Sequence, residues 1–275
     1  MPELPEVETV RRALLLKLKN KKINNLTILH NNVFEGQDIE KVIHDICGEK
    51  INDIKRRGKW LMFELDSYYL LSHLRMEGKY LYRDIGSDIG KHELVVFNIN
   101  NEFELRYKDV RKFGKMYLVP KDELDKSKIS ALGYEPWDKN LTSDYLLSKY
   151  KNKSIPIKTI LLDQSIIVGI GNIYADEILF LSKINPHKRG KNITKKECEL
   201  IIENTKKVLD KAIKEGGTTI RSYTSEEGVT GLFQNSLNVH MKEKEPCPSC
   251  GTLIVRDKIN GRSSYYCPKC QKDTK

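Results

Sequence analysis

The spacing of hydrophobic residues changes near Pro120, and this change divides the chain into two kinds of structure. From Ile23 to Pro120, short runs such as KWLMFEL, YYLLSHL, ELVVFNI and EFELRY are rich in β-branched and aromatic residues and are separated by Asn, Asp and Gly. These runs predict β-strands, and NINNEF predicts a tight hairpin between two of them. Many short strands without intervening helices indicate a sandwich or a barrel.

Helices are expected before and after these strands. A helix from Pro5 to about Lys19 begins with a favoured proline and presents one apolar face, formed by Val7, Val10, Leu14 and Leu18. After Pro120, the segments TSDYLLSKYK, PIKTILLD and NIYADEILFLSK predict helices. A further helix over 195–215 opens with the capping box of Thr194 and Glu197 and stops at a Gly-Gly pair.

Four of the six cysteines form two pairs, Cys247-Pro-Ser-Cys250 and Cys267-Pro-Lys-Cys270, which are separated by sixteen residues. This spacing is typical of a zinc ion held by four thiolates. Two disulfides are the alternative, but they require an oxidising compartment, and nothing in the sequence marks the chain as secreted. Asn260-Gly261 predicts a hairpin between the two pairs. The sequence therefore predicts a β-ribbon with one structural Zn²⁺.

The expected fold class is α+β with three domains. Residues 1–130 form an N-terminal β-sandwich domain with its leading helix, 131–239 form a helical domain, and 240–275 form the zinc finger. The opening residues are acidic and lack the apolar segment of a secretory signal. The most apolar stretch, TILLDQSIIVGIGNIYADEILFL, contains several polar residues, which argues against a membrane span. The cytoplasm is the expected compartment.

Positive charge is concentrated in the second half of the chain. The net charge is +10, and residues 151–275 carry 22 Lys and Arg against 14 Asp and Glu, whereas residues 1–150 carry a net charge of only +2. Such a surplus suggests a polyanionic partner, and it is equally consistent with a role in solubility alone.

Two segments of the basic half could bind an anion. GIGNIYADE (169–177) places two glycines and Asn172 at a helix start, where backbone N–H groups attract anions. A plain Gly-rich turn explains it equally well, and a dinucleotide-binding motif is excluded because its third glycine is missing. In INGRSSYY, Arg262 follows the hairpin turn, so the ribbon either presents its guanidinium in a fixed direction or leaves it solvated.

The opening segment, MPELPEVE, crowds three carboxylates and two prolines into eight residues. We expect Met1 to be removed, which exposes the secondary amine of Pro2. Such an amine is partly neutral and nucleophilic at neutral pH, and its attack on a carbon that bears a leaving group yields an iminium. Glu3 could then supply a proton. In the alternative reading, Glu3 and Glu6 only complement the helix dipole.

The chain resembles the formamidopyrimidine-DNA glycosylase family, bacterial enzymes that remove 8-oxoguanine and ring-opened purines from DNA. The resemblance runs nearly end to end through PELPEVETV, RRGKW (56–60), SHLRMEGKY (72–80), RKFG (111–114), IKTILLDQSIIVGIGNIYADE (157–177), GGTTIRSY (216–223) and the four cysteines. It implies a β-sandwich, a helix–two-turns–helix domain and a zinc ribbon, in a monomer that acts on damaged double-stranded DNA. One departure is His240-Met241, where the family usually has Tyr-Gly.

The resemblance also implies a catalytic set. Pro2 is the nucleophile at C1′ of the damaged nucleotide, Glu3 is its acid/base partner, and Glu6 is a supporting carboxylate. Lys59 is similar to the essential lysine of the family, which lies beside the lesion phosphate. Arg262 completes the set from the ribbon tip. A Schiff base would form and then collapse by β- and δ-elimination, leaving a gapped strand.

Further residues are implied to contact DNA. Asn172 and Arg262 would grip the phosphates on either side of the lesion, since extruding a nucleotide requires a fixed backbone. His73 and Lys158 are similar to additional DNA contacts. Three residues correspond to those that fill the space left by the extruded base: Met76, Arg111 and Phe113. The loop that closes over the base corresponds to the segment with Thr219, Ile220, Arg221 and Tyr223.

Three functions remain open from the sequence. The leading hypothesis is a bifunctional glycosylase and abasic-site lyase for oxidised purines, acting in base excision repair. An endonuclease VIII-like enzyme for oxidised pyrimidines shares the same fold. A catalytically silent binder of damaged DNA shares the basic half and the zinc ribbon, but it has no use for Pro2 and Glu3.

Overall fold

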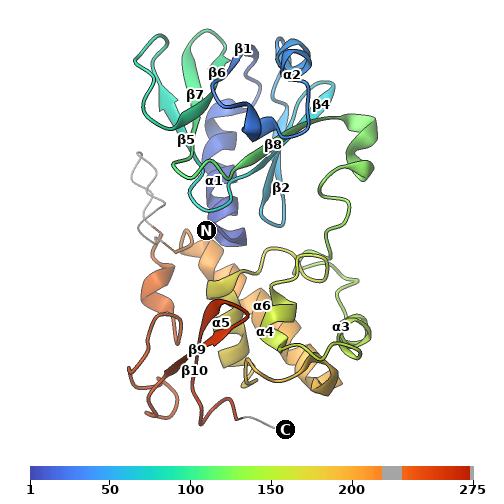
Figure 1. Cartoon of the computed structure of the whole chain (residues 1–275), viewed down its shortest axis with the longest axis vertical. Coiled ribbons are helices and arrows are strands. Elements are labelled where there is room, and N and C mark those ends of the chain that lie inside the picture. Colours follow the sequence, from blue (N-terminus) through green and yellow to red (C-terminus); the bar gives the residue numbers. More distant parts are fainter. Residues whose placement is uncertain (219–230, 273–275) are drawn as a thin grey trace. The chain divides into compact units, whose positions relative to one another are not determined.

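The computed structural model describes residues 1–218 and 231–272, and it divides into two compact units (Figure 1). Unit 1 contains Met1–Ser130. Unit 2 contains Ala131–Thr218 and the described residues from Leu232 onward.

Unit 1 contains two four-stranded antiparallel sheets, with strand orders β1-β6-β7-β5 and β2-β3-β4-β8. The strands are β1 (Ile23–Ile28), β2 (Asp53–Arg57), β3 (Trp60–Glu64), β4 (Tyr68–His73), β5 (Lys79–Arg83), β6 (Glu93–Ile99), β7 (Phe103–Lys108) and β8 (Lys115–Pro120). The helices in the described part of unit 1 are α1 (Leu4–Leu18) and α2 (Ile39–Ile46), with short 3-10 helices η1 (Asn31–Phe34) and η2 (Lys121–Lys126).

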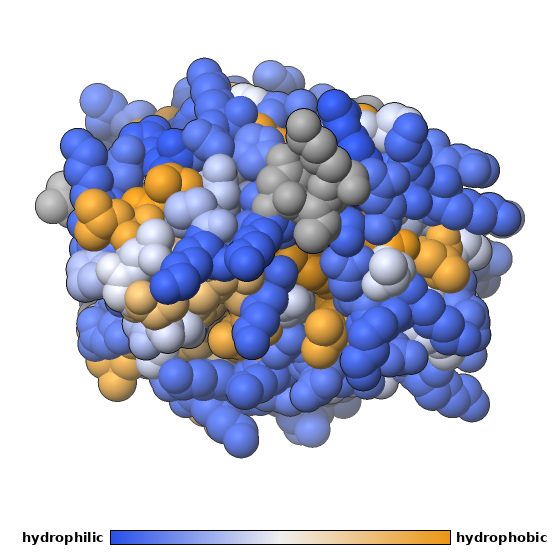
Figure 2. Space-filling model, turned by 90° about the horizontal axis from the view of Figure 1, so that it is seen from below, coloured by the Kyte–Doolittle hydropathy of each residue, from blue (hydrophilic) through white to orange (hydrophobic). Residues whose placement is uncertain are grey.

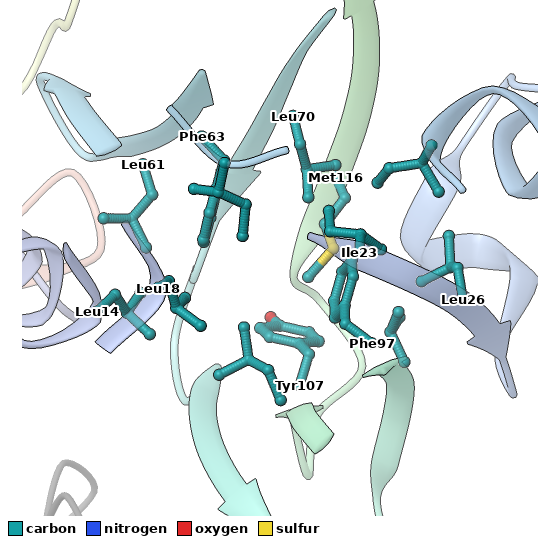
Figure 3. Packing of buried hydrophobic residues seen from close by; sticks show 14 of the residues in the cluster. Leu14, Leu18, Ile23, Leu26, Leu61, Phe63, Leu70, Phe97, Tyr107 and Met116 are labelled. Atoms are coloured by element: carbon teal, nitrogen blue, oxygen red, sulfur yellow. The ribbon is translucent and has the colours of Figure 1, made fainter. Parts of the chain in front are cut away.

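Both sheets and α1 contribute to one hydrophobic core. Figure 3 shows Leu14 and Leu18 from α1 together with strand residues such as Phe63, Phe97 and Tyr107. The whole apolar face predicted for α1 is buried. Each such aliphatic or aromatic side chain contributes about 1.5–3 kcal/mol when it leaves water. The predicted sandwich and its leading helix are therefore confirmed.

The prediction of strands alone between Ile23 and Pro120 is wrong at α2. This helix begins because the Asp38 carboxylate accepts hydrogen bonds from the backbone N–H groups of Glu40 and Lys41. Val42 and Ile46 then lie four residues apart on its buried face. A single helix of eight residues is easily overlooked among strands of similar composition.

Two predicted hairpin turns are confirmed. Asn100 and Asn101 join β6 to β7, with φ of 55° and 56°. Asn260 and Gly261 join the two ribbon strands, with φ of 45° and 78°. Both turns require two successive left-handed residues, a conformation that asparagine and glycine adopt at low cost.

Unit 2 contains the predicted helices and the ribbon. Its elements are α3 (Ser143–Tyr150), α4 (Ile157–Leu161), α5 (Asn172–Leu181), η3 (Gly190–Asn192), α6 (Lys195–Lys214), η4 (Phe233–Ser236), β9 (Val255–Ile259) and β10 (Arg262–Tyr266). The capping box of α6 is present, because Thr194 N–H donates to Glu197 Oε2 at 2.8 Å and Glu197 N–H donates to Thr194 Oγ1 at 3.2 Å.

The ribbon packs against the end of α5. Phe180 of that helix lies in one buried cluster with Val239, Ile254 and two of the four predicted zinc ligands, Cys247 and Cys267. This shared cluster explains why the helices and the ribbon belong to the same compact unit.

The face of the molecule seen in Figure 2 is mainly polar. Hydrophilic residues cover most of the face in Figure 2, and apolar residues lie between them in separate groups. Among the described residues, no helix combines the length and apolar character that crossing a membrane requires.

Candidate functional site

The first turn of α1 holds two carboxylates next to Pro2. The backbone N–H of Glu3 donates to Glu6 Oε2 at 2.8 Å, and the two residues form a capping box. Pro2, Glu3 and Glu6 are all buried. The positive end of the helix dipole stabilises negative charge at this position. The capping box thus fixes the direction of both carboxylates relative to the Pro2 backbone.

Lys59 lies in the two-residue turn between β2 and β3, and its side chain is buried. Gly58, the other turn residue, has a φ of 56°. Arg56 connects this turn to α1, because its Nη1 donates to the Gly58 carbonyl at 3.0 Å and its Nε donates to Glu8 Oε2 at 3.3 Å. The turn that carries Lys59 is therefore tied to the helix that follows Pro2.

Glu8 is the acceptor at the centre of this connection. Its carboxylate also accepts from Arg11 Nη2 and Arg12 Nε, each at 2.8 Å. Burial alone raises the pKa of Glu8, but the hydrogen bonds from Arg11 and Arg12 and the charge of Arg56 outweigh it, so the pKa is lowered. Glu8 is therefore anionic at neutral pH and holds the arginines in place.

His73 is the last residue of β4 and lies opposite Trp60 of β3 in the sheet. The two rings meet edge to face, with their centroids 4.8 Å apart. Burial, followed by the positive charges of Arg75 and Lys59, lowers the pKa of His73 to about 3. Its Nδ1 lies 3.0 Å from the backbone nitrogen of Arg75 and accepts that N–H. A neutral ring that accepts at Nδ1 carries its proton on Nε2. His73 is thus a fixed neutral donor, suited to a phosphate oxygen.

The predicted gap-filling residues lie on two loops of unit 1. Met76 lies between β4 and β5, whereas Arg111 and Phe113 lie between β7 and β8. The Arg111 guanidinium lies over the Phe113 ring, 4.8 Å from its centroid, and Phe113 is 49% exposed. Phe113 is therefore not part of the core, and its insertion into the DNA stack stays a prediction.

In unit 2, Asn172 and Lys158 both bind the backbone of β10. Asn172 Nδ2 donates to the Ser263 carbonyl at 3.0 Å, and Lys158 Nζ donates to the same oxygen at 2.9 Å and to Ser264 Oγ at 2.8 Å. Lys158 also pairs with Asp176 Oδ1 at 2.7 Å and is only 1% exposed. This environment makes Lys158 a support of the ribbon, and its predicted DNA contact stays a prediction.

Arg262 is exposed at the start of β10, immediately beside this support. On the other side of the hairpin turn, Asn260 Nδ2 donates to Thr159 Oγ1 at 3.0 Å, which ties the ribbon tip to α4. A cavity of about 290 Å³ lies here, and its lining includes Arg262, Asn260 and Thr159. The Arg262 side chain therefore lines this cavity and extends from a hairpin tip whose backbone is fixed.

Two acidic residues of α5 bind the segment before the ribbon, residues 238–240, which we call the approach to the ribbon. Asp176 Oδ2 lies 2.7 Å from His240 Nδ1. Glu177 accepts from the backbone N–H groups of Asn238, Val239 and His240 and from the Asn238 side chain, at 2.8–3.0 Å. His240, where the family usually has tyrosine, is thus fixed at both its ring and its backbone.

The four predicted zinc ligands converge. The Sγ atoms of Cys247, Cys250, Cys267 and Cys270 lie within 4.8 Å of one another, and the closest cross-pairs are 3.5 Å and 3.9 Å apart. A tetrahedral ion with bonds of about 2.3 Å places its sulfur ligands about 3.8 Å apart, whereas a disulfide requires about 2.05 Å. The donor set fits zinc, and the chain carries one structural Zn²⁺ here.

Not every predicted site residue can be placed. Thr219, Ile220, Arg221 and Tyr223 lie outside the described residues. The roles assigned to the other residues remain predictions, although the structure gathers Pro2, Glu3 and Glu6 at one helix start.

Sequence reasoning missed the buried acids that hold these elements, namely Glu8, Asp109 and Glu177. Asp109 had a detectable signal, because an aspartate shortly before a Gly-containing loop often accepts from the following backbone N–H groups. Glu177 had none, since its partners lie more than sixty residues further along the chain.

Three family models match the chain. The formamidopyrimidine-DNA glycosylase N-terminal domain matches residues 1–116, and the formamidopyrimidine-DNA glycosylase H2TH domain matches residues 132–224. The zinc finger found in FPG and IleRS matches residues 244–272. These matches cover the sandwich, the helices and the cysteine ribbon in the order in which the structure shows them.

Known relatives are similar over almost the full length. The formamidopyrimidine-DNA glycosylases of Bacillus cereus and Oceanobacillus iheyensis are each 44% identical over 273 residues, which is 98% of this chain and 99% and 98% of theirs.

Solved structures of the Lactococcus lactis enzyme show the same fold. A variant of that protein in complex with Fapy-dG-containing DNA has a TM-score of 0.93 and 36% identity, covering 99% of this chain and 100% of that one. A complex with abasic-site DNA has a TM-score of 0.92 and 37% identity, covering 98% and 100%. The sandwich, the helical region, the zinc ribbon and the similarity along the whole sequence agree, and the chain belongs to the formamidopyrimidine-DNA glycosylase family of DNA-repair enzymes.

Proposed function

We propose that this protein excises oxidised purines from duplex DNA and then cleaves the resulting abasic site, using Pro2 as the nucleophile. The observation that carries the proposal is the buried capping box beside Pro2, in which Glu6 holds the Glu3 backbone. A capping box explains the presence of Glu3 and Glu6, but it does not require a proline amine directly before them. Family membership supplies the reaction class to which this arrangement is suited.

The proposed chemistry begins with removal of Met1, which otherwise blocks the Pro2 nitrogen as an amide. The freed nitrogen forms a bond to C1′ while the glycosidic bond breaks and its electron pair leaves with the base. The nitrogen then gives up its proton, and the departing base takes up one. Glu3 donates a proton to O4′, the sugar ring opens, and an iminium remains. Loss of a C2′ proton then expels the 3′-phosphate, and a second elimination expels the 5′-phosphate.

Other residues would hold the substrate. Lys59 and His73 belong to unit 1 and present a cation and a neutral N–H donor, both suited to phosphate oxygens. Arg262, supported through Ser263 by Asn172 and Lys158, offers a guanidinium from unit 2. We propose that these residues bind damaged duplex DNA and that the protein acts as a monomer in the bacterial cytoplasm. Affinity should then fall steeply with salt concentration, since phosphate contacts release counterions.

The base specificity has two candidates. The curated relatives are formamidopyrimidine-DNA glycosylases, and three of the similar structures contain Fapy-dG DNA, which favours ring-opened and oxidised purines. Another similar structure of the Lactococcus lactis protein contains DNA with an oxidised pyrimidine. Oxidised pyrimidines are therefore the second substrate class to be tested.

Reductive trapping tests the proposal. The protein is incubated with duplexes that contain 8-oxoguanine, a formamidopyrimidine, an oxidised pyrimidine or an abasic site, and borohydride is added. We expect a covalent adduct with the purine lesions and the abasic site, and a markedly weaker one with the pyrimidine. Binding without any adduct would leave only the silent damaged-DNA binder, and dominant trapping on the pyrimidine would support the second substrate class.

The variant Pro2→Gly replaces the secondary amine of proline by the primary amine of glycine and leaves the DNA-contacting residues unchanged. It should lose most of its strand scission while it still binds a stable abasic analogue, because the DNA contacts of His73 and Arg262 remain. Strand scission at the parental rate would contradict the role of Pro2.

A further inference from the structure

The two loops that carry Met76, Arg111 and Phe113 share a common support beneath them. The Asp109 carboxylate is 0% exposed and accepts three backbone N–H groups of the loop that follows it. Oδ1 accepts from Arg111 at 2.9 Å, and Oδ2 accepts from Phe113 at 2.9 Å and from Gly114 at 2.8 Å. The buried charge is thus balanced by amide dipoles, which fix the backbone on both sides of the exposed Arg111 and Phe113 side chains.

Asp109 is itself anchored at its backbone. Its N–H donates to the His92 carbonyl at 3.0 Å, and its carbonyl accepts from Lys112 N–H at 3.3 Å. Lys112 has a φ of 58°, which turns the chain back toward the carboxylate. The loop therefore has a defined shape in the absence of DNA, and Arg111 stacks on Phe113 within it.

Tyr107 connects this loop to the loop of Met76. A Cβ atom added to Gly114 would lie 1.6 Å from the Tyr107 hydroxyl oxygen, and one added to Gly78 would lie 2.3 Å from the same atom. Both separations are far below van der Waals contact. The backbones of the two loops are thus packed directly against one phenol group, which belongs to the hydrophobic core of the sandwich (Figure 3).

We propose that Asp109 and Tyr107 are positioning residues that hold Met76, Arg111 and Phe113 ready for insertion into the DNA stack. This inference rests on the proposed function, in which those three side chains fill the space of the extruded base. Preorganised loops lose less conformational freedom on binding, so extrusion of the base is favoured. Removal of the support should therefore impair base extrusion without touching the chemistry at Pro2.

The variant Asp109→Asn tests the inference because it keeps the size of the side chain. One of the two acceptor oxygens becomes an NH₂ group, so at least one loop N–H faces a donor. We expect the single-turnover rate of base removal from an 8-oxoguanine duplex to fall at least tenfold. Borohydride trapping on a single-stranded oligonucleotide with a preformed abasic site should stay within twofold of the parent, since that substrate leaves no gap to fill.

A fluorescent base reports the insertion itself. With 2-aminopurine opposite an abasic analogue, the parent should raise the fluorescence as the opposing base is unstacked, and Asp109→Asn should show a reduced change at saturating protein. The matched control is Asp66→Asn. Asp66 also accepts a backbone N–H, that of Lys50 at 3.2 Å, and it lies in the turn between β3 and β4, at the opposite end of that hairpin from His73. Gly114→Ala, which forces the loop away from Tyr107, should reproduce the effect of Asp109→Asn.

The outcomes separate the two proposals. If the parent traps neither substrate, the proposed function fails and this inference fails with it. If the parent traps both and Asp109→Asn removes the base from the duplex at the parental rate, the inference alone is wrong. An equal loss on the duplex and on the single strand, with an unchanged melting temperature, would also overturn it, because the defect would then lie outside gap filling.

Discussion

Two buried carboxylates, Asp109 in unit 1 and Glu177 in unit 2, perform the same task over very different distances along the chain. Asp109 accepts three backbone N–H groups that lie within five residues of it. Glu177 accepts four N–H bonds from residues that lie 61–63 positions further on. The first shapes a loop, whereas the second joins a helix to the approach of the zinc ribbon.

The difference extends to the rest of each unit. In unit 1, the capping box at Glu3 and the loop held by Asp109 depend on near neighbours in the sequence. In unit 2, the surroundings of Arg262 depend on bonds that span about a hundred residues, such as that from Lys158 to Ser263. We therefore expect one substitution in unit 2 to disturb the whole surroundings of Arg262, whereas the capping box and the Asp109 loop of unit 1 can be perturbed separately.

Removal of the zinc should have the largest effect. In Cys267→Ser, the ribbon loses a ligand, and zinc binding supplies about 10–16 kcal/mol of folding energy in small finger peptides. We expect loss of the metal and of tight binding to an abasic-analogue duplex, while the fold of unit 1 is retained. Metal analysis and fluorescence anisotropy measure the two effects. Cys47→Ser, outside the cluster, is the control and should keep one zinc per chain.

Glu177→Ala should be the next most damaging change. It leaves four donors without their acceptor, two of them buried, and we expect a loss of about 3–5 kcal/mol in the free energy of unfolding, measured by urea denaturation. Asp109→Ala should cost only about 1–2 kcal/mol, because only one of its three hydrogen bonds, that from Gly114, is buried. The exposed Glu203→Ala, on α6, should change stability by less than about 0.5 kcal/mol. A greater loss from Asp109→Ala than from Glu177→Ala would reverse the comparison.

Lys158 and Asp176 should show energetic coupling. Lys158→Met leaves the buried Asp176 carboxylate without its cation, so we expect it to cost about 3 kcal/mol, and the added change Asp176→Asn should recover part of that loss. A double-mutant cycle in urea should give a coupling energy of about 1–3 kcal/mol. Lys207→Met, exposed on α6, serves as the control. Additive losses would show that the ion pair does not support the ribbon.

The last prediction concerns the titration of His73. Because burial and the charges of Arg75 and Lys59 lower the pKa of this ring from 6.5 to about 3, the folded protein keeps it neutral where the unfolded chain takes up a proton. The contribution of this residue to stability is complete above pH 6.5 and is lost as the pH falls toward 3. The NMR signal of the ring should therefore stay constant from pH 8 to pH 4. A midpoint near 6.5 would show that the ring is solvated and unconstrained.

The parts of the fold that could be predicted are those with local signals. The capping box of Thr194, the asparagine turns and the apolar face of α1 are written within a few neighbouring residues, and the structure confirms them. The helix α2 was missed because it has only eight residues, which are too few for the helical period of apolar residues to stand out among the neighbouring strands.

The candidate site divides in the same way. Four cysteines at a fixed spacing predict their metal, whereas the roles of Pro2 and Glu3 follow from the family resemblance and stay predictions. No local pattern shows that Lys158 is buried beside Asp176 or that Tyr107 packs against two glycines. Those arrangements arise only when distant segments meet, so they require the three-dimensional structure.

The claim on which the account depends is that the freed Pro2 nitrogen bonds to deoxyribose. Its most direct test is peptide mass mapping of the protein after borohydride reduction with 8-oxoguanine duplex. The account predicts that the reduced sugar adduct lies on an N-terminal peptide that begins at Pro2 and lacks Met1. An adduct on a lysine such as Lys59, or full activity in protein that retains Met1, would contradict it.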